Sequence, residues 1–206
     1  MSAELNFVHQ YIPGSSDRTL LLLHGTGGDE NQLVGLGREL DPTAAVLSPR
    51  GPVSENGHLR FFRRFAEGVF DLEDLKRRTD DLAEFIGAAA VRYHLAPEKI
   101  VAVGYSNGAN IAASILLRRP EALRTAVLFR AMVPLQPEAV PDLSAVRVWI
   151  GGGKQDTIIP PEETQRLAEL LRRAGAEVTA RFFDADHGLT NTEFVIVQRW
   201  LAGLST

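Results

Sequence analysis

The sequence contains no cysteine, which excludes disulfide bridges, zinc sites built on thiolates and cysteine nucleophiles. It also lacks an apolar run long enough to cross a bilayer, and its first residues lack the basic start and apolar core of a secretory signal. The formal net charge of −4 offers no basic field to a phosphate backbone. We therefore expect a cytoplasmic protein that does not insert into membranes and does not bind nucleic acid.

The amino-acid composition is typical of a compact globular chain. Of the 206 residues, 45% are hydrophobic and 23% are charged. A chain of this size hides roughly 70% of the surface that its unfolded form exposes, so it can hold both a core and a recessed pocket. Because no internal repeat or low-complexity linker divides the sequence, we expect residues 1–206 to form one domain.

Apolar segments of strand length alternate with amphipathic segments of helix length. This alternation is typical of a parallel sheet that is covered by helices on both faces. It predicts an α/β fold with a mostly parallel sheet of about six or seven strands. The expected strands are 19–24, 44–48, 100–104, 126–129, 146–150 and 178–183, with an edge strand in 5–11, and the expected helices are 72–93, 106–119, 161–174 and 190–204.

Residues 49–70 do not fit the alternation. They contain two prolines, three glycines and several aromatic residues. A connection of this length is often functional, for example as a lid over an active site. We therefore expect a long loop here.

Residues 104–108, with the sequence Gly-Tyr-Ser-Asn-Gly, lie between an expected strand and an expected helix. In that context the pattern G-x-S-x-G indicates a nucleophile elbow. The two glycines permit a sharp turn that exposes the hydroxyl of Ser106 above the start of the helix. The alternative is a plain strand-to-helix turn in which Ser106 caps the helix.

A serine nucleophile needs a base, and the pKa of histidine suits that task. His187 lies between the last strand and the last helix, where the carboxyl ends of parallel strands meet. We prefer it to the four other histidines. His9 fits an edge strand, His24 a glycine-rich segment, His58 a mobile loop and His94 a helix end.

The base must itself be oriented by an acceptor, usually a carboxylate. Asp156 follows a separate strand, and the order Ser106, Asp156, His187 is the order of this triad in α/β-hydrolases. An aspartate that caps a turn is the alternative. Asp184 and Asp186 rank second, because residues adjacent in sequence rarely point at one another.

Ester cleavage also needs hydrogen-bond donors for the oxyanion. We assign the backbone N–H of Asn107, which follows the serine, and that of Thr26, which lies in the glycine-rich segment 24–29. A plain glycine-rich loop or a phosphate-binding loop is the alternative for that segment, but the lysine of a phosphate-binding loop is missing.

The segments 23–29, 104–110, 152–160 and 187–189 resemble the carboxylesterase and lysophospholipase family of α/β-hydrolases, especially its small bacterial members. This family also contains the acyl-protein thioesterases. The resemblance implies a triad of Ser106, Asp156 and His187 with oxyanion donors at Thr26 and Asn107. Two departures argue against activity on acylated proteins: Asn107 replaces the usual glutamine, and residues 129–134 replace a small Ser-Gly segment.

The sequence thus predicts a serine carboxylesterase for short- to medium-chain esters that works through an acyl-enzyme intermediate. We expect a small-molecule ester as its partner, with no metal and no cofactor, and the sequence leaves a homodimer open. A thioesterase or lysophospholipase is the first alternative, and a non-catalytic binding protein is the second. The expected pocket residues, each of which also fits a core position, are Phe65, Phe70, Met132 and Leu189. Four arginines could recognise a substrate carboxylate or simply face solvent: Arg60, Arg63, Arg64 and Arg130.

Overall fold

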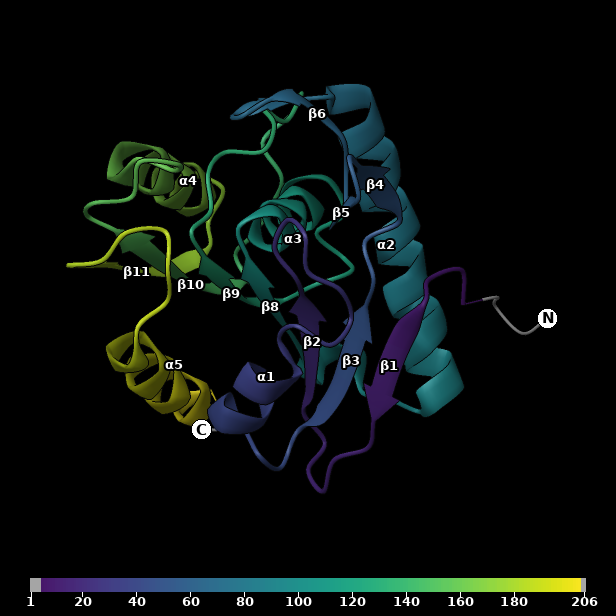
Figure 1. Ribbon diagram of the computed structural model, residues 1–206. Coiled ribbons are helices and arrows are strands. Elements are labelled where there is room, and N and C mark those ends of the chain that lie inside the picture. The colour runs from purple at the N-terminus through teal and green to yellow at the C-terminus, as the bar shows by residue number, and fades with distance from the viewer. Residues whose placement is uncertain (1–4, 205–206) are drawn as a thin grey trace.

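The computed structural model describes residues 5–204, and a sheet of seven strands forms the centre of this part of the chain (Figure 1). The strand order is β1-β3-β2-β8-β9-β10-β11, and each neighbouring pair is parallel except β1 with β3. The mostly parallel sheet predicted from the sequence is therefore confirmed. Its strands are β1 (His9–Ile12), β2 (Thr19–Leu23), β3 (Ala45–Pro49), β8 (Ile100–Tyr105), β9 (Thr125–Phe129), β10 (Arg147–Gly153) and β11 (Glu177–Phe183).

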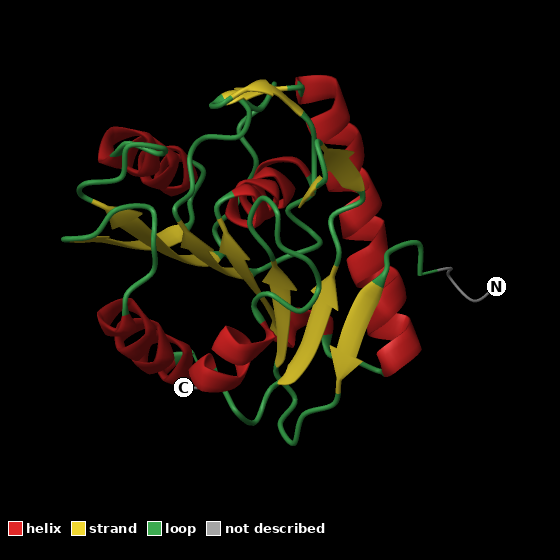
Figure 2. Cartoon of the chain, in the orientation of Figure 1, coloured by secondary structure: helices red, strands yellow, loops and turns green. Residues whose placement is uncertain are grey.

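Helices cover both faces of the sheet, as expected (Figure 2). Helices α2, α3 and α4 lie on one face, and α1 and α5 lie together on the other (Figure 1). Alternate side chains of β2 divide between two buried cores, Leu21 and Leu23 on the first face and Leu20 and Leu22 on the second. The helices are α1 (Val34–Leu40), α2 (Leu72–Tyr93), α3 (Asn107–Arg118), α4 (Pro161–Arg173) and α5 (Asn191–Gly203), with a short 3-10 turn at Pro97–Lys99.

Local signals at both ends explain why α2 has the predicted bounds. The side chain of Asp71 caps the first turn by accepting a hydrogen bond from the backbone N–H of Asp74. At the other end His94 adopts a left-handed conformation with φ of 56°, a common way to end a helix. Between these ends, buried residues recur at helical spacing from Leu75 to Ala90.

The prediction of a continuous loop over 49–70 is wrong. This part of the chain forms two small antiparallel hairpins, β4 (Val53–Glu55) with β5 (His58–Arg60) and β6 (Arg64–Ala66) with β7 (Val69–Phe70). Asn56 and Gly57 both have positive φ, 51° and 81°, which is the geometry of a two-residue hairpin turn. The dipeptide Asn-Gly is a strong signal for this turn, so the first hairpin could have been predicted.

Helix α1 was not predicted either. It has only seven residues, two of which are glycines, and no side chain caps its first turn. Its position depends on tertiary packing against β2 and α5, which local sequence does not encode. Within residues 5–204, no helix combines the length and the apolar character that a membrane crossing needs.

Candidate active site

Ser106 lies in the sharp turn between β8 and α3. Its backbone has φ of 52° and ψ of −113°, a conformation that costs energy in a residue other than glycine. The turn is held by hydrogen bonds from Ser106 N to Phe129 O and from Asn110 N to Ser106 O, both 2.9 Å. A Cβ atom at Gly108 would lie 2.0 Å from the carbonyl oxygen of Leu23, so the second glycine of the motif is needed for close packing of helix on strand.

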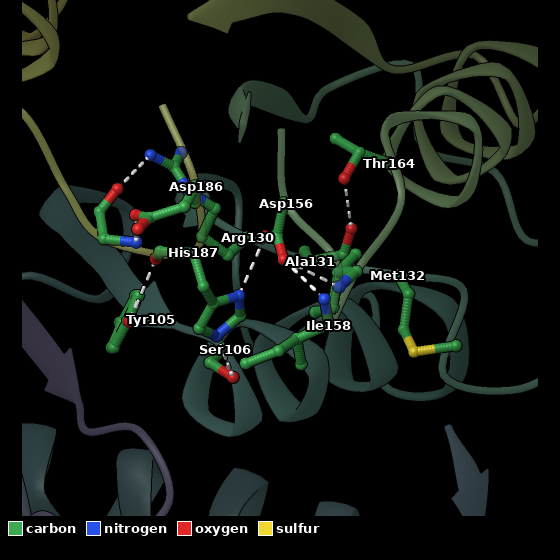
Figure 3. A network of polar contacts seen from close by, with 12 residues as sticks. Tyr105, Ser106, Arg130, Ala131, Met132, Asp156, Ile158, Thr164, Asp186 and His187 are labelled. Atoms are coloured by element: carbon green, nitrogen blue, oxygen red, sulfur yellow. Dashed lines mark hydrogen bonds and ion pairs between the residues drawn. The ribbon is translucent and has the colours of Figure 1, made fainter. Parts of the chain in front are cut away.

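Ser106, His187 and Asp156 form a hydrogen-bonded chain across three loops (Figure 3). The distance from Ser106 Oγ to His187 Nε2 is 3.0 Å, and that from His187 Nδ1 to Asp156 Oδ2 is 2.8 Å. Because the Asp156 carboxylate is an acceptor, the proton of a neutral His187 is assigned to Nδ1, which leaves Nε2 free to accept the serine proton. This arrangement can transfer a proton from a serine hydroxyl to an imidazole.

Asp156 is fixed by more than its contact with His187. Its second oxygen, Oδ1, accepts hydrogen bonds from the backbone N–H groups of Ile158 and Ile159, each 2.9 Å long. The carboxylate itself is fully buried. The three donors together hold the negative charge and orient Oδ2 toward the imidazole. Asp184 lies elsewhere, in an exposed ion pair with Lys154.

The four other histidines have different surroundings. His9 contacts the hydroxyl of Tyr93, His94 ends α2, and His58 is exposed on β5. His24 is buried: its Nδ1 lies 2.8 Å from Gly25 O, and its Nε2 accepts a hydrogen bond from Gly51 N. Burial lowers the pKa of His24 below its ordinary value of 6.5, so this residue is neutral at physiological pH.

Thr26 and Asn107 lie beside Ser106 in the lining of one pocket. Within the described part of the chain, the backbone N–H groups of these two residues donate to no protein acceptor. Their side chains are engaged: Thr26 Oγ1 accepts from Arg60 Nη1 at 2.6 Å, and Asn107 Oδ1 accepts from Phe61 N at 2.7 Å. These contacts fix both backbone segments while leaving their N–H groups available to a ligand.

The pocket beside Ser106 has a volume of about 240 Å³. Phe70 and Met132, two of the residues expected there, line it together with Ile158 and Ile159. The other two expected residues lie outside its lining. Phe65 is 76% exposed on the second hairpin, and Leu189 packs against the core on the α1 and α5 face of the sheet.

Two arginines bring positive charge to the pocket wall. Arg60 is buried and Arg64 is half-buried, and both line the pocket, whereas Arg63 pairs with Asp71 outside it. Burial, reinforced by the nearby charge of Arg64, lowers the pKa of Arg60. Acidic partners balance part of this charge, with Glu55 3.4 Å from Arg60 and Glu67 3.9 Å from Arg64.

The expectation that Arg130 faces a substrate or solvent is wrong. Its side chain is fully buried, and it forms an ion pair of 2.6 Å with the equally buried Glu193 of α5. It also donates to backbone carbonyls on either side of His187 (Figure 3). Tyr105 is a further neighbour that the sequence did not single out, and its hydroxyl donates to the carbonyl oxygen of His187 at 3.0 Å.

The parallel sheet, the strand-to-helix turn at Ser106 and the contacts of that serine define a hydrolase with an α/β-hydrolase fold. The family model described as "Dienelactone hydrolase family" matches residues 63–198, and the chain belongs to that family. The resemblance to small bacterial carboxylesterases is confirmed as well by the solved structures of relatives.

Three relatives illustrate the likeness. The chain is 46% identical over 192 residues to the "Putative hydrolase MhqD" of Bacillus subtilis (strain 168), a match that covers 93% of this chain and 96% of that protein. It is 44% identical to the Bacillus cereus carboxylesterase, with a TM-score of 0.94 and coverage of 96% and 94%. It is 32% identical to YahD, whose structure is described with malic acid, with a TM-score of 0.90 and coverage of 96% of this chain and 98% of that chain.

Proposed function

We propose that this hydrolase is a serine carboxylesterase that cleaves short- to medium-chain carboxylic esters through an acyl-enzyme intermediate. The observation that carries the proposal is the chain of contacts from Ser106 Oγ through His187 to Asp156, with distances of 3.0 Å and 2.8 Å, at the wall of a pocket. The carboxylesterase relatives support the same chemistry.

In the first half of the reaction, His187 Nε2 removes the proton from Ser106 Oγ as this oxygen attacks the ester carbonyl. The negative charge that develops on the carbonyl oxygen is stabilised by the backbone N–H groups of Thr26 and Asn107. The Asp156 carboxylate stabilises the imidazolium of His187. The imidazolium then protonates the leaving alcohol, and the acyl group stays on Ser106.

In the second half, water takes the place of the alcohol. His187 accepts a proton from the water as it attacks the acyl carbon, the same two N–H groups stabilise the second tetrahedral intermediate, and Ser106 leaves with the proton returned to its oxygen. The products are a carboxylic acid and the free enzyme. Every step uses residues of this chain and one water molecule.

The pocket supports a small and partly polar substrate. Its volume of about 240 Å³ is below the usual range of ligand pockets, which favours short acyl groups over long lipids. Phe70, Met132 and Ile158 offer apolar contact, and Arg60 and Arg64 provide positive charge at the wall. An ester that carries a carboxylate near the scissile bond fits this mixture, and the relative YahD, whose structure is described with malic acid, supports that choice.

A chromogenic ester series tests the proposal. The wild-type protein should hydrolyse acetate and butyrate esters faster than long-chain esters and should be labelled by a fluorophosphonate at Ser106. Ser106→Ala should lower kcat by at least about 10⁴-fold and abolish the labelling. Ser144→Ala is the matched control, because Ser144 is exposed at the far end of the sheet and its substitution should leave kcat unchanged.

Matched thioesters and lysophospholipids, assayed beside the oxygen esters, test the alternatives. A preference for either class would replace the carboxylesterase proposal. If the wild-type protein showed neither turnover nor labelling, the hypothesis of a non-catalytic binding protein on a hydrolase fold would be favoured. Retained activity in Ser106→Ala would show that Ser106 is not the nucleophile.

A further inference from the structure

Side chains and backbone groups from three neighbouring strand ends hold the loop that carries His187. This loop joins β11 to α5, and four of its carbonyl oxygens in succession accept hydrogen bonds from outside the loop. Loops run over the protein surface and are often mobile, so four successive bonds of this kind restrain the loop. The donors are Gln155 N to Ala185 O at 3.0 Å, Arg130 Nε to Asp186 O at 3.1 Å, Tyr105 Oη to His187 O at 3.0 Å, and Arg130 Nη2 to Gly188 O.

Arg130 supplies two of these four bonds, and it is held rigidly itself. Its side chain has no exposed surface, and its guanidinium meets the carboxylate of Glu193 with two hydrogen bonds of 2.6 Å and 2.9 Å. Nη1 also lies 3.3 Å from Gly151 O in β10. The backbone of Arg130, directly after β9, has φ of 55°, a value that is uncommon in residues other than glycine.

Glu193 extends the same network into α5. Its carboxylate also accepts from the backbone N–H and the hydroxyl of Thr190. The first of these bonds and the bond from Glu193 N to Thr190 Oγ1 form the capping box at the start of that helix. The helix that follows the loop and the strand ends beside it are thus joined through a single guanidinium. His187 lies between the two carbonyls that this guanidinium binds.

We propose that Arg130, held by Glu193, is a positioning residue that fixes the imidazole of His187 for proton transfer. The inference rests on the proposed function, in which His187 is the base. Arg130 touches neither the pocket nor the reacting atoms, so it acts only through the backbone of residues 186–188. The expected consequence of losing it is a slower chemical step with unchanged substrate binding.

Stability alone does not account for this arrangement. A buried ion pair can often be replaced by apolar side chains of similar volume with no loss of stability, because removing both charges from water is costly. A planar guanidinium does what an apolar group cannot, since its donors point in fixed directions toward several acceptors at once. Here those acceptors are the carboxylate of Glu193 and the carbonyls on both sides of His187.

The substitution Arg130→Lys removes the planar guanidinium but not the positive charge, so its expected effect differs from that of a general loss of folding. Lysine keeps the positive charge beside Glu193, but its ammonium group is too compact to reach both carbonyls and the carboxylate. We expect kcat for a butyrate ester to fall by about 10²-fold, the scale of a displacement of about 1 Å in a catalytic group, with KM within about twofold of wild type. Fluorophosphonate labelling of Ser106 should slow in proportion.

Arg130→Gly provides a rescue experiment, because glycine adopts the positive φ at this position freely and leaves a space shaped for the missing guanidinium. Millimolar guanidinium, far below denaturing concentrations, should raise the kcat of Arg130→Gly at least about tenfold above its value without guanidinium. This is the effect expected of one well-placed charge-assisted contact. Leu82→Ala is the matched control for stability: it removes a buried side chain of α2 far from the loop, and guanidinium should not change its kcat.

A readout that does not depend on turnover separates the two proposals. The proton shared by His187 Nδ1 and Asp156 Oδ2 should give a far-downfield proton resonance in the wild-type protein, which broadens in Arg130→Lys and stays sharp in Leu82→Ala. Wild-type kcat together with an unchanged resonance in Arg130→Lys would overturn the positioning role. A wild-type protein that neither cleaves esters nor labels at Ser106 would instead overturn the proposed function, and the resonance would still decide the role of Arg130.

Discussion

The substitution Asp156→Asn tests how the base is oriented, and the structure determines which way the new amide would turn. One oxygen of Asp156 accepts from the N–H groups of Ile158 and Ile159, and the other faces His187 Nδ1. In the asparagine variant the carbonyl must stay toward the two N–H groups, so the NH2 group faces His187. It then donates to Nδ1, and the proton of the imidazole moves to Nε2.

The reverse orientation of the amide is costly. It would aim the NH2 group at two backbone donors and leave both without an acceptor, which costs about 1–3 kcal/mol for a buried group such as the N–H of Ile159. With the proton on Nε2, His187 donates to Ser106 Oγ and can no longer accept its proton. The loss of kcat should therefore be about 10⁴-fold, which corresponds to about 5.4 kcal/mol in the activation free energy.

The assay is hydrolysis of a chromogenic butyrate ester, with thermal unfolding measured alongside. Asp184→Asn is the matched control, since it makes the same change at a carboxylate that is exposed and paired with Lys154. Its kcat should stay within about twofold of wild type, because an exposed pair contributes little. Near-normal kcat in Asp156→Asn, or a large loss in Asp184→Asn, would refute this account of the acid.

Two further predictions concern protonation and charge. Because burial lowers the pKa of His24, the unfolded chain takes up a proton below pH 6.5 that the folded protein does not bind. The free energy of unfolding should therefore fall as the pH drops below 6.5, by at most about 1.4 kcal/mol per pH unit. The fall should end once His24 is protonated in the folded protein as well. Urea denaturation at several pH values checks this, and equal slopes for wild type and His24→Gln would contradict it. Arg64→Gln should raise KM for a hemisuccinate ester about fivefold relative to the matched butyrate ester, because a partly exposed charge contributes about 1 kcal/mol. Equal changes for the two esters in steady-state kinetics would argue against carboxylate recognition.

The parts of the fold that follow from local sequence were predicted closely. Residues 72–93 carry a helical stripe and end signals, and the buried strand at Thr19–Leu23 is a continuous apolar run, so each element is specified by its own residues. Ser106 could be singled out because a sharp strand-to-helix turn needs glycines at fixed positions. His187 was chosen by eliminating four other histidines, and Asp156 by its place in the chain order and by the family resemblance. The structure places His187 beside Ser106 and Asp156 beside His187.

The remainder could not be predicted because it depends on contacts between distant segments. Phe61 and Phe62 are fully buried, whereas Phe65, only three residues further on, is exposed, and nothing in the sequence of this aromatic cluster distinguishes them. Arg130 is an ordinary arginine in the sequence, and its burial depends on Glu193, 63 residues away. A charge on a loop is usually exposed, so only the fold reveals this pair.

The hairpin segment 50–71 has a consequence for how this enzyme scaffold can diversify. The catalytic candidates project from the ends of sheet strands, whereas Arg60, Arg64, Glu67, Gly68 and Phe70 belong to one contiguous insertion between β3 and α2. Several hydrogen bonds join this segment to residues 24–29 and to Asn107, among them Arg60 Nη1 to Thr26 Oγ1 and the backbone N–H of Phe61 to Asn107 Oδ1. We expect exchange of this segment between relatives to change part of the pocket wall and to leave the contacts among Ser106, His187 and Asp156 intact, provided that these hydrogen bonds form again.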